Sequence, residues 1–334
     1  MTEGVSGMRV GLDIGGTKVL AVAVDVDGRV VASVRTGSEP GPDRVVDVAT
    51  AAVAALAGRL GTDSAAFAGI GVGVPGLVDA ERGVLSHAVN LGVGEDGLAL
   101  AQRLGERTGL PVRVENDVNA AALGAARTLG VGSDLAYLSI GTGLAAGLVV
   151  DGALHRGARG TAGEIGHVPV DPAGPLCGCG QRGCLEALGS GSAIARAWPV
   201  DGPRAGRRSG SRSGSRSGAG SGSGSGEGPA HGLFRAATAG DLKAVAVRDE
   251  VAGHLASAVQ LLVLTVDADV VVLGGGVADV GEPLRAAVAA ALTRRGRDSA
   301  FLASLDLPAR VRLVPAGQPV AAIGAALLVP EPGR

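Results

Sequence analysis

Aromatic residues are scarce in this sequence, and neither sign of charge dominates it. The 334 residues include one Trp, one Tyr and three Phe, and the formal net charge is −2 at pH 7. Proteins that read nucleic acids by stacking need aromatic rings, and a phosphate backbone or an anionic membrane surface attracts basic proteins. We therefore expect small-molecule partners, no nucleic acid and no membrane, and a core built from Ala, Val and Leu.

A leader segment and long hydrophobic runs are also lacking. Residues Met1–Val10 show no positively charged stretch followed by an apolar one. No uninterrupted apolar run of about 18 residues, the length that a membrane-spanning helix needs, occurs in the sequence. These absences predict a cytoplasmic protein.

Cysteine is limited to three residues in one short segment, Cys177, Cys179 and Cys184. An odd number of cysteines so close together excludes a framework of disulfide bonds. With His167 shortly before them, they match a closed tetrahedral site of three thiolates and one imidazole. We predict that these four residues bind a structural Zn²⁺; the alternative is that the thiols are inert and buried.

Short β-rich runs alternate with helical patterns along the chain. Apolar residues at three- and four-residue spacing indicate the helices, and apolar runs that end at glycine or proline indicate the strands. This alternation predicts an α/β fold in which helices cover the faces of a sheet. The predicted strands are Met8–Ile14, Val19–Val26, Val30–Thr36, Gly69–Val74, Val112–Glu115, Asp269–Leu273 and Arg310–Val314. The predicted helices are Pro42–Leu60, Leu98–Thr108, Leu185–Ala197, Leu233–Leu264, Pro283–Arg295 and Val320–Leu328.

Two segments of the chain resemble each other. Val10–Asp25 and Tyr137–Asp151 each have the pattern of a strand, a glycine turn with threonine, and a returning strand. The length of the chain suits two compact α/β domains, and the repeat predicts that these are similar and face each other. The alternative is a chance likeness of glycine-rich hairpins. Residues 203–228, rich in Ser, Gly and Arg, are expected to form a flexible surface loop.

The glycine turns of the two hairpins suit phosphate binding, although each could also be an ordinary tight turn. Without side chains in the way, backbone N–H groups can approach a ligand closely. Asp13 precedes the first turn and is placed to hold Mg²⁺ through water, whereas Ser139 stands at the matching position of the second hairpin. Glycines that end the strand Asp269–Leu273 could approach an adenosine. The predicted nucleotide-binding residues are Asp13, Gly15, Gly16, Thr17, Lys18, Gly141, Thr142, Gly143, Gly274 and Gly275.

A run of polar residues follows the predicted strand Val112–Glu115 and places Asp117 at a strand-to-helix junction. A carboxylate in such a position can accept the proton of a sugar hydroxyl during phosphoryl transfer, which requires little beyond a positioned base and charge neutralisation. We predict that Asp117 is the catalytic base. The alternative is that Asp117 only caps the helix that follows.

These segments together resemble the ROK family of sugar kinases and sugar-responsive repressors, and within it the bacterial glucokinases. The matching stretches span most of the chain apart from the Ser/Gly/Arg tract. They are Asp13-Ile-Gly-Gly-Thr-Lys18, Gly73-Val-Pro-Gly76, Glu115-Asn-Asp-Val-Asn-Ala-Ala120, Ile140-Gly-Thr-Gly143, Gly163-Glu-Ile-Gly-His167 and Cys177-Gly-Cys-Gly-Gln-Arg-Gly-Cys-Leu-Glu186.

The resemblance implies an actin-like ATPase (ribonuclease H-like) fold, in which two related α/β domains close over a cleft that holds ATP and sugar. We expect a first domain at residues 1–117, to which a helix at about 319–330 returns, and a second domain at residues 118–318. The family's usual assembly implies a dimer or tetramer of identical chains. The cofactors expected are ATP, Mg²⁺ and structural Zn²⁺.

The resemblance also implies roles for single residues. The catalytic base of the family falls on Asp117, and His167 contacts the sugar while binding zinc through its other ring nitrogen. In the glucokinase branch the phosphate goes to the 6-hydroxyl of glucose. The sugar-binding residues implied in this way are Asn116, Asp117, Glu164, His167 and Glu186.

The sequence departs from the family's pattern at two places. Ala145 and Ala146 stand where relatives usually have glycines, which slightly crowds the nucleotide turn. Val89–Gly97, a loop that lies near the sugar in relatives, lacks the tryptophan-containing pattern common in glucokinases, which leaves the acceptor sugar open. The alternative enzyme is an N-acetylmannosamine or N-acetylglucosamine kinase. The alternative outside enzymes is a non-catalytic sugar-sensing regulator, against which the intact Asp117 and the absence of room for a DNA-binding module before Met8 argue.

Overall fold

The computed structural model describes residues 7–131, 134–199 and 228–331, which form two five-stranded sheets and one two-stranded sheet. The first sheet has the order β3-β2-β1-β4-β7. Neighbours among β1, β2 and β3 are antiparallel, whereas β1, β4 and β7 run parallel. The strands are β1 (Arg9–Ile14), β2 (Lys18–Val24), β3 (Val30–Gly37), β4 (Gly69–Val74) and β7 (Val112–Asn116). Each predicted strand of this part is confirmed to within two residues.

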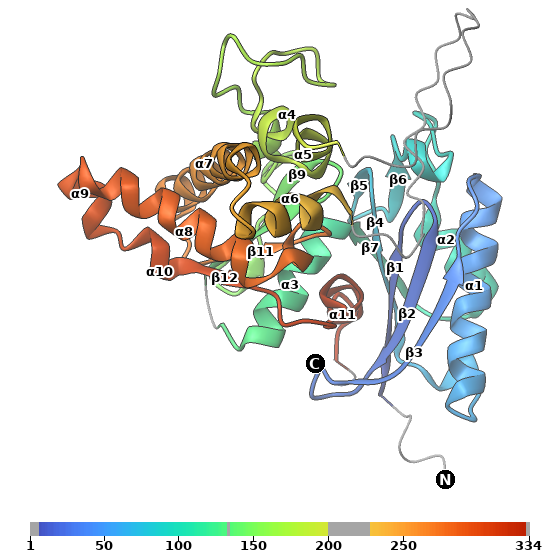
Figure 1. Ribbon diagram of the computed structural model, residues 1–334. Coiled ribbons are helices and arrows are strands. Elements are labelled where there is room, and N and C mark those ends of the chain that lie inside the picture. The colour runs from blue at the N-terminus through green and yellow to red at the C-terminus, as the bar shows by residue number, and fades with distance from the viewer. Residues whose placement is uncertain (1–6, 132–133, 200–227, 332–334) are drawn as a thin grey trace, which may run out of the picture.

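Two helices cover one face of the first sheet (Figure 1). They are α1 (Pro42–Arg59) and α2 (Leu100–Thr108). Pro42 occupies the first turn of α1, where its missing N–H costs no hydrogen bond, and Val45, Ala49 and Leu56 bury the inner side of the helix. A small hairpin of β5 (Leu77–Asp79) and β6 (Val84–Ser86) follows β4, and single 3₁₀ turns lie at η1 (Ser64–Ala66) and η2 (Val89–Leu91).

The second sheet repeats the topology of the first. Its order is β10-β9-β8-β11-β12, with an antiparallel hairpin of β8 and β9 and with β11 and β12 parallel to β8. The strands are β8 (Leu135–Ile140), β9 (Leu144–Val150), β10 (Ala153–Leu154), β11 (Val270–Gly274) and β12 (Val311–Leu313). The internal repeat therefore reflects two similar sheets, and the predicted α/β class is confirmed.

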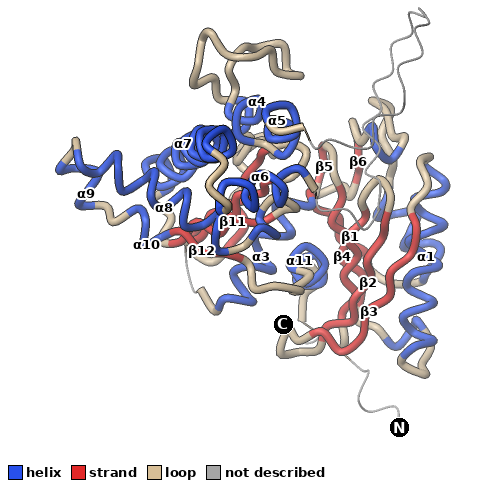
Figure 2. Tube along the Cα trace, viewed as in Figure 1, coloured by secondary structure: helices blue, strands red, loops and turns tan. Residues whose placement is uncertain are grey.

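Helices cover the outer side of the second sheet, as Figure 2 shows, some against its strands and others against neighbouring helices. They are α4 (Leu185–Gly189), α5 (Gly191–Ala197), α6 (Pro229–Thr238), α7 (Leu242–Val266), α8 (Glu282–Arg297), α9 (Ala300–Ser304) and α10 (Leu307–Arg310), with 3₁₀ turns at η3 (Ile165–His167) and η4 (Ala278–Val280). The predicted loop at residues 203–228 lies outside the described residues, apart from Gly228, which precedes α6.

Two predicted helices are wrong because capping residues divide them. The segment Leu185–Ala197 is broken at Ser190, whose backbone is extended and whose hydroxyl accepts a hydrogen bond from the amide of Ala193 at the start of α5. The segment Leu233–Leu264 is broken at Gly240 and Asp241, and the Asp241 carboxylate caps α7. Apolar periodicity continued across both breaks and concealed them.

Helix α7 has the length and apolar character of a membrane span. Its Val251, Leu255 and Val259 are buried in the hydrophobic core of the second sheet, and α6 and α8 pack along it. A long core helix of a folded domain has the same composition as a span, and these contacts identify α7 as such a core helix.

Helices α3 (Asp117–Leu129) and α11 (Val320–Leu327) pack against each other between the two sheets (Figure 1). Helix α3 packs on β8 and β9, whereas α11 packs on β1, β2 and β4. The crossing is close because small residues face each other: a Cβ atom on Gly324 would overlap the carbonyl oxygen of Ala120, and one on Gly124 would overlap that of Val320. The domain boundary at residues 117 and 118 stays a prediction.

Candidate active site

The turns of the β1–β2 and β8–β9 hairpins occupy matching positions in the two sheets. In the first turn the amide of Gly15 donates to the carbonyl oxygen of Lys18 (2.9 Å), and in the second the amide of Gly141 donates to that of Gly143 (3.0 Å). The polar side chains at the tips are exposed: Thr17, Lys18 and Thr142. Gly16 lies against Asn90, where an added Cβ would sit 3.0 Å from the Asn90 Cβ. Both turns can therefore present polar groups to a ligand, and phosphate binding there stays a prediction.

Asp13 lies on β1 just before the first turn and is partly buried. Burial, and then the neighbouring Asp117 carboxylate, raise the pKa of Asp13 to about 6, while Arg35 acts in the opposite direction. Two close carboxylates with little compensating positive charge are poorly stabilised as anions. A divalent cation would supply the missing charge, so the donor set at Asp13 fits the predicted Mg²⁺.

The carboxyl end of β11 shares a cavity with Asp13. The cavity has a volume of about 260 Å³ and is lined by Asp13, Tyr137, Gly274 and Gly275, among others. Gly275 has a φ of +79°, and an added Cβ would come within 2.7 Å of the carbonyl oxygen of Ile140. The backbone can turn here because residue 275 is a glycine, and a Cβ on Gly274 would overlap the Tyr137 side chain. The structure thus brings the predicted adenosine end of the site beside the predicted metal-binding carboxylate.

Asp117 begins helix α3 but is not its cap. The Asn116 side chain caps the helix by accepting from the amides of Val118 (2.9 Å) and Asn119 (3.3 Å). The alternative interpretation of Asp117 as the helix cap is therefore corrected. Burial raises the pKa of Asp117, backbone hydrogen bonds from Val118 and from its own amide lower it, and the nearby Glu164 carboxylate raises it.

A second cavity, of about 590 Å³, contains two of the predicted sugar-binding residues, Asn116 and Glu164. The Asn116 amide nitrogen donates to the carbonyl oxygen of Gly76 (3.3 Å), which also lines this cavity. Two further lining residues, Glu115 and Arg156, form an ion pair of 2.6 Å that the sequence analysis missed. Glu115 belongs to the polar run already noted, but no pattern points to Arg156, because only the fold brings it to its partner.

Glu186 and His167 lie on the side of the second hairpin. The Glu186 carboxylate accepts from the amide of Leu144 at the start of β9 (3.1 Å), and its other oxygen lies 4.0 Å from the sulfur of Cys177. His167 places Nε2 at 4.0 Å from the Glu164 carboxylate and Nδ1 at 3.8 Å from the Cys177 sulfur. Glu186 is not among the residues that line the second cavity, and its sugar contact stays a prediction.

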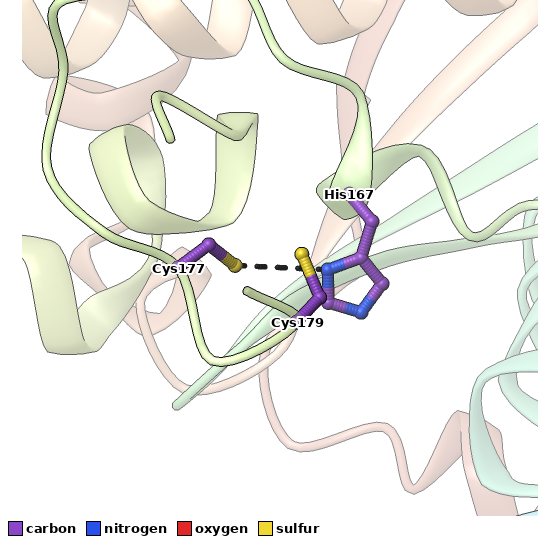
Figure 3. Close-up of side chains that lie close together, drawn as sticks. All are labelled: His167, Cys177 and Cys179. Carbon is purple, nitrogen blue, oxygen red and sulfur yellow. Dashed lines mark hydrogen bonds between the residues drawn. The ribbon is translucent and has the colours of Figure 1, made fainter. Parts of the chain in front are cut away.

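The predicted zinc ligands gather in one cluster, as Figure 3 shows for three of them. The ligand atoms of His167, Cys177 and Cys179 lie within 4.8 Å of one another, and the sulfur of Cys184 lies 3.6 Å from that of Cys179. Tetrahedral bonds of about 2.0 to 2.3 Å place zinc ligands roughly 3.5 to 3.8 Å apart. Hydrogen bonds from the amide and side chain of Gln181 lower the pKa of Cys179, whereas burial and the neighbouring thiols raise the pKa of Cys184, so the fit to zinc rests on the distances. The donor set therefore fits zinc.

Comparison of the sequence with known proteins gives one family. The family model described as ROK family matches residues 9–332. A glucokinase of Halalkalibacterium halodurans is 33% identical over 281 residues, which cover 82% of this chain and 82% of the relative. An N-acetylmannosamine kinase of Vibrio cholerae is 35% identical over 189 residues, which cover 55% of this chain and 62% of the relative.

Solved structures agree with the sequence comparison. A ROK hexokinase from Thermus thermophilus is 33% identical and superposes with a TM-score of 0.76, covering 96% of this chain and 97% of that one. A ROK family glucokinase from Streptomyces griseus, in complex with glucose and AMPPNP, is 29% identical with a TM-score of 0.72, covering 97% and 99%. The expected actin-like ATPase fold is confirmed. Because the family model spans nearly the whole chain and whole structures of the family superpose on it, the chain belongs to the ROK family.

Proposed function

We propose that the protein is an ATP-dependent hexose kinase, and specifically a glucokinase that transfers the γ-phosphate of ATP to the 6-hydroxyl of glucose. The position of Asp117 carries this proposal. Its carboxylate interacts electrostatically with Asp13, which lines the cavity of about 260 Å³, and with Glu164, which lines the cavity of about 590 Å³. This coupling to one residue of each cavity supports a base that acts between nucleotide and sugar, where a phosphoryl group would pass.

In this proposal Asp117 accepts the proton of the attacking hydroxyl. Burial raises its pKa, and a more basic carboxylate is a better proton acceptor as long as it is ionised at the working pH. Hydrogen bonds from the first turn of α3 fix the orientation of the carboxylate. The placement of a base on a rigid helix end is what phosphoryl transfer asks of the protein, together with neutralisation of phosphate charge.

The remaining residues would bind and orient the substrates. Asp13 would hold Mg²⁺, which when bound neutralises phosphate charge, and the glycine turns at Gly15 and Gly141 would contact the phosphates. Asn116, Glu164, His167 and Glu186 would bind sugar hydroxyls. The Cys/His cluster would hold a structural Zn²⁺ and fix His167 and the start of α4, from which Glu186 projects.

The second candidate is an N-acetylmannosamine or N-acetylglucosamine kinase. It is supported by the similarity to the Vibrio cholerae enzyme and by the cavity of about 590 Å³, which offers room beyond a hexose ring. Every mechanistic role proposed for Asp117 and Asp13 is unchanged in this alternative. A cytoplasmic location, a dimeric or tetrameric assembly, and the absence of nucleic-acid or membrane partners stay predictions.

The test is ADP release by the purified protein with Mg-ATP across glucose, mannose, fructose, N-acetylglucosamine and N-acetylmannosamine. We expect the highest kcat/KM with glucose. A preference for an acetamido sugar would move the assignment to the second candidate. Sugar binding without turnover on any sugar would refute the kinase and support a sugar-sensing regulator.

A further inference from the structure

Arg156 links the second half of the chain to β7, the strand that leads into the helix carrying Asp117. It follows β10, and its Nε donates to the Glu115 carboxylate at 2.6 Å. The other Glu115 oxygen accepts from the amide of Asn116 (2.9 Å) and from the side chain of Asn119 (3.0 Å). The Glu115 side chain is only 3% exposed, so these donors, rather than water, stabilise its negative charge.

The two η nitrogens of the Arg156 guanidinium have no protein partner among the described residues. Nε donates to Glu115, and neither η nitrogen makes a hydrogen bond to a residue in the described parts of the chain. The side chain is 41% exposed and lines the cavity of about 590 Å³ together with Asn116 and Glu164. An arginine needed only to neutralise Glu115 could use its paired Nε and η groups on the carboxylate. This one instead keeps donors available in the cavity.

The loop that carries Arg156 lines the cavity and is held in place at two points. The amide of Ala162 donates to the carbonyl oxygen of Arg156 (3.1 Å), which closes the loop on itself. At the other end of the loop, Gly160 approaches the β5–β6 hairpin, where an added Cβ would sit 3.9 Å from the carbonyl oxygen of Val78. Because the backbone is fixed at these points and Nε is fixed by Glu115, the η nitrogens have a defined position, which selective recognition of one hydroxyl requires.

We infer that Arg156 is a specificity-determining residue that donates a hydrogen bond from its η nitrogens to one hydroxyl of the acceptor sugar, with Glu115 as its anchor. The inference rests on the proposed sugar-kinase function and adds a contact that spans the two sheets. The sugar would bridge Asn116 on the first half of the molecule and Arg156 on the second. A site built to donate to a hydroxyl discriminates against a sugar that lacks it, because the donor is then left unpaired.

The test compares the wild type with Arg156→Lys. Lysine can keep the charge pair with Glu115 and so preserve the fold, but its single ammonium cannot also reproduce the guanidinium fork. Glucose and each monodeoxy analogue that retains the reacting hydroxyl are titrated by calorimetry without nucleotide. We expect the wild type to bind one analogue about tenfold or more weaker than glucose because of the missing hydrogen bond. In R156K that particular difference should shrink to within about twofold, while the differences for the other analogues persist.

The matched control is Arg103→Lys, whose guanidinium also pairs with a carboxylate, that of Asp43 (2.6 Å), but lies outside the cavity of about 590 Å³. R103K should keep the wild-type pattern of analogues. An equal loss for every sugar in R156K, or the same loss in R103K, would overturn the assignment of a specific contact. A thermal melt of each variant separates loss of folding from loss of binding; if R156K unfolds, the double variant Glu115→Gln/Arg156→Met, which removes both charges, replaces it in the same titration.

The two proposals fail in different ways. A wild type that binds glucose but releases no ADP refutes the kinase and leaves the analogue pattern to decide the role of Arg156. A wild type that binds no sugar refutes both.

Discussion

Asp13→Asn should make the protein more stable while abolishing its activity. The partial burial of Asp13 and the nearby Asp117 carboxylate raise the pKa of Asp13 from its ordinary value of 3.8 to about 6. Ionised Asp13 is therefore unfavourable in the folded protein without metal. Asparagine keeps the size of the side chain and removes the charge, so it should relieve this cost and also remove the proposed Mg²⁺ ligand.

The magnitude follows from linkage. Because the pKa of Asp13 is higher in the folded than in the unfolded protein, Asp13 does not oppose folding at low pH. Its unfavourable contribution to the free energy of folding grows as the pH rises from about 4 to about 6, and above that it stays constant. A pKa of about 6 in place of 3.8 corresponds to about 3 kcal/mol at pH 7.5 and to about half as much at pH 5. The gain of the variant over the wild type should therefore be larger at the higher pH.

The assay is urea unfolding of both proteins at pH 5 and pH 7.5, with EDTA present so that no metal offsets the charge. Asp241→Asn serves as the control, because Asp241 is an exposed helix cap and asparagine caps equally well. A D13N variant that is less stable than the wild type, or whose advantage is the same at both pH values, would refute the reasoning. In a parallel experiment without EDTA, added Mg-ATP should stabilise the wild type and have little effect on D13N.

Three further predictions test the base, the metal and the packing. Asp117→Asn should lower kcat a hundredfold or more and leave sugar binding largely intact, and an unchanged kcat would remove Asp117 as the base. Metal analysis of protein purified without chelator should find about one zinc per chain, and the Cys179→Ser variant should lose zinc and melt at a lower temperature. A wild-type protein without zinc would support the alternative that the three thiols are inert. Gly324→Ala should destabilise the α3–α11 crossing by about 1 to 3 kcal/mol in urea unfolding, because its Cβ would overlap the carbonyl oxygen of Ala120. Gly58→Ala in α1, where nothing lies within 4 Å of the new Cβ, should be neutral or slightly stabilising, and equal losses at both sites would contradict the packing argument.

Local patterns in the sequence predicted the strands and hairpins well. The hairpins whose turns follow Asp13 and Ser139 were recognisable because in each of them two apolar strands flank a glycine turn. Both the strand pattern and the turn depend only on residues that are close together in the sequence. The Cys/His cluster was recognisable because its cysteines fall in one short segment with His167 close before it. Helix boundaries at Ser190 and Asp241 were missed, because a cap is a single polar residue within a continuing apolar pattern.

The sequence by itself determined the two hairpins, the polar run around Asp117 and the cysteine segment, since each depends on neighbours along the chain. Only the tertiary structure decided that Asn116, not Asp117, caps α3, and that Asp117 is electrostatically coupled to Asp13 and Glu164, which line the two cavities. It alone also decided the pairing of Glu115 with Arg156, 41 positions apart. The physical reason is that these features exist only when α3 and α11 bring the two sheets together. Only then are the carboxylates buried, which raises their pKa, and only then do distant segments of the chain come into contact.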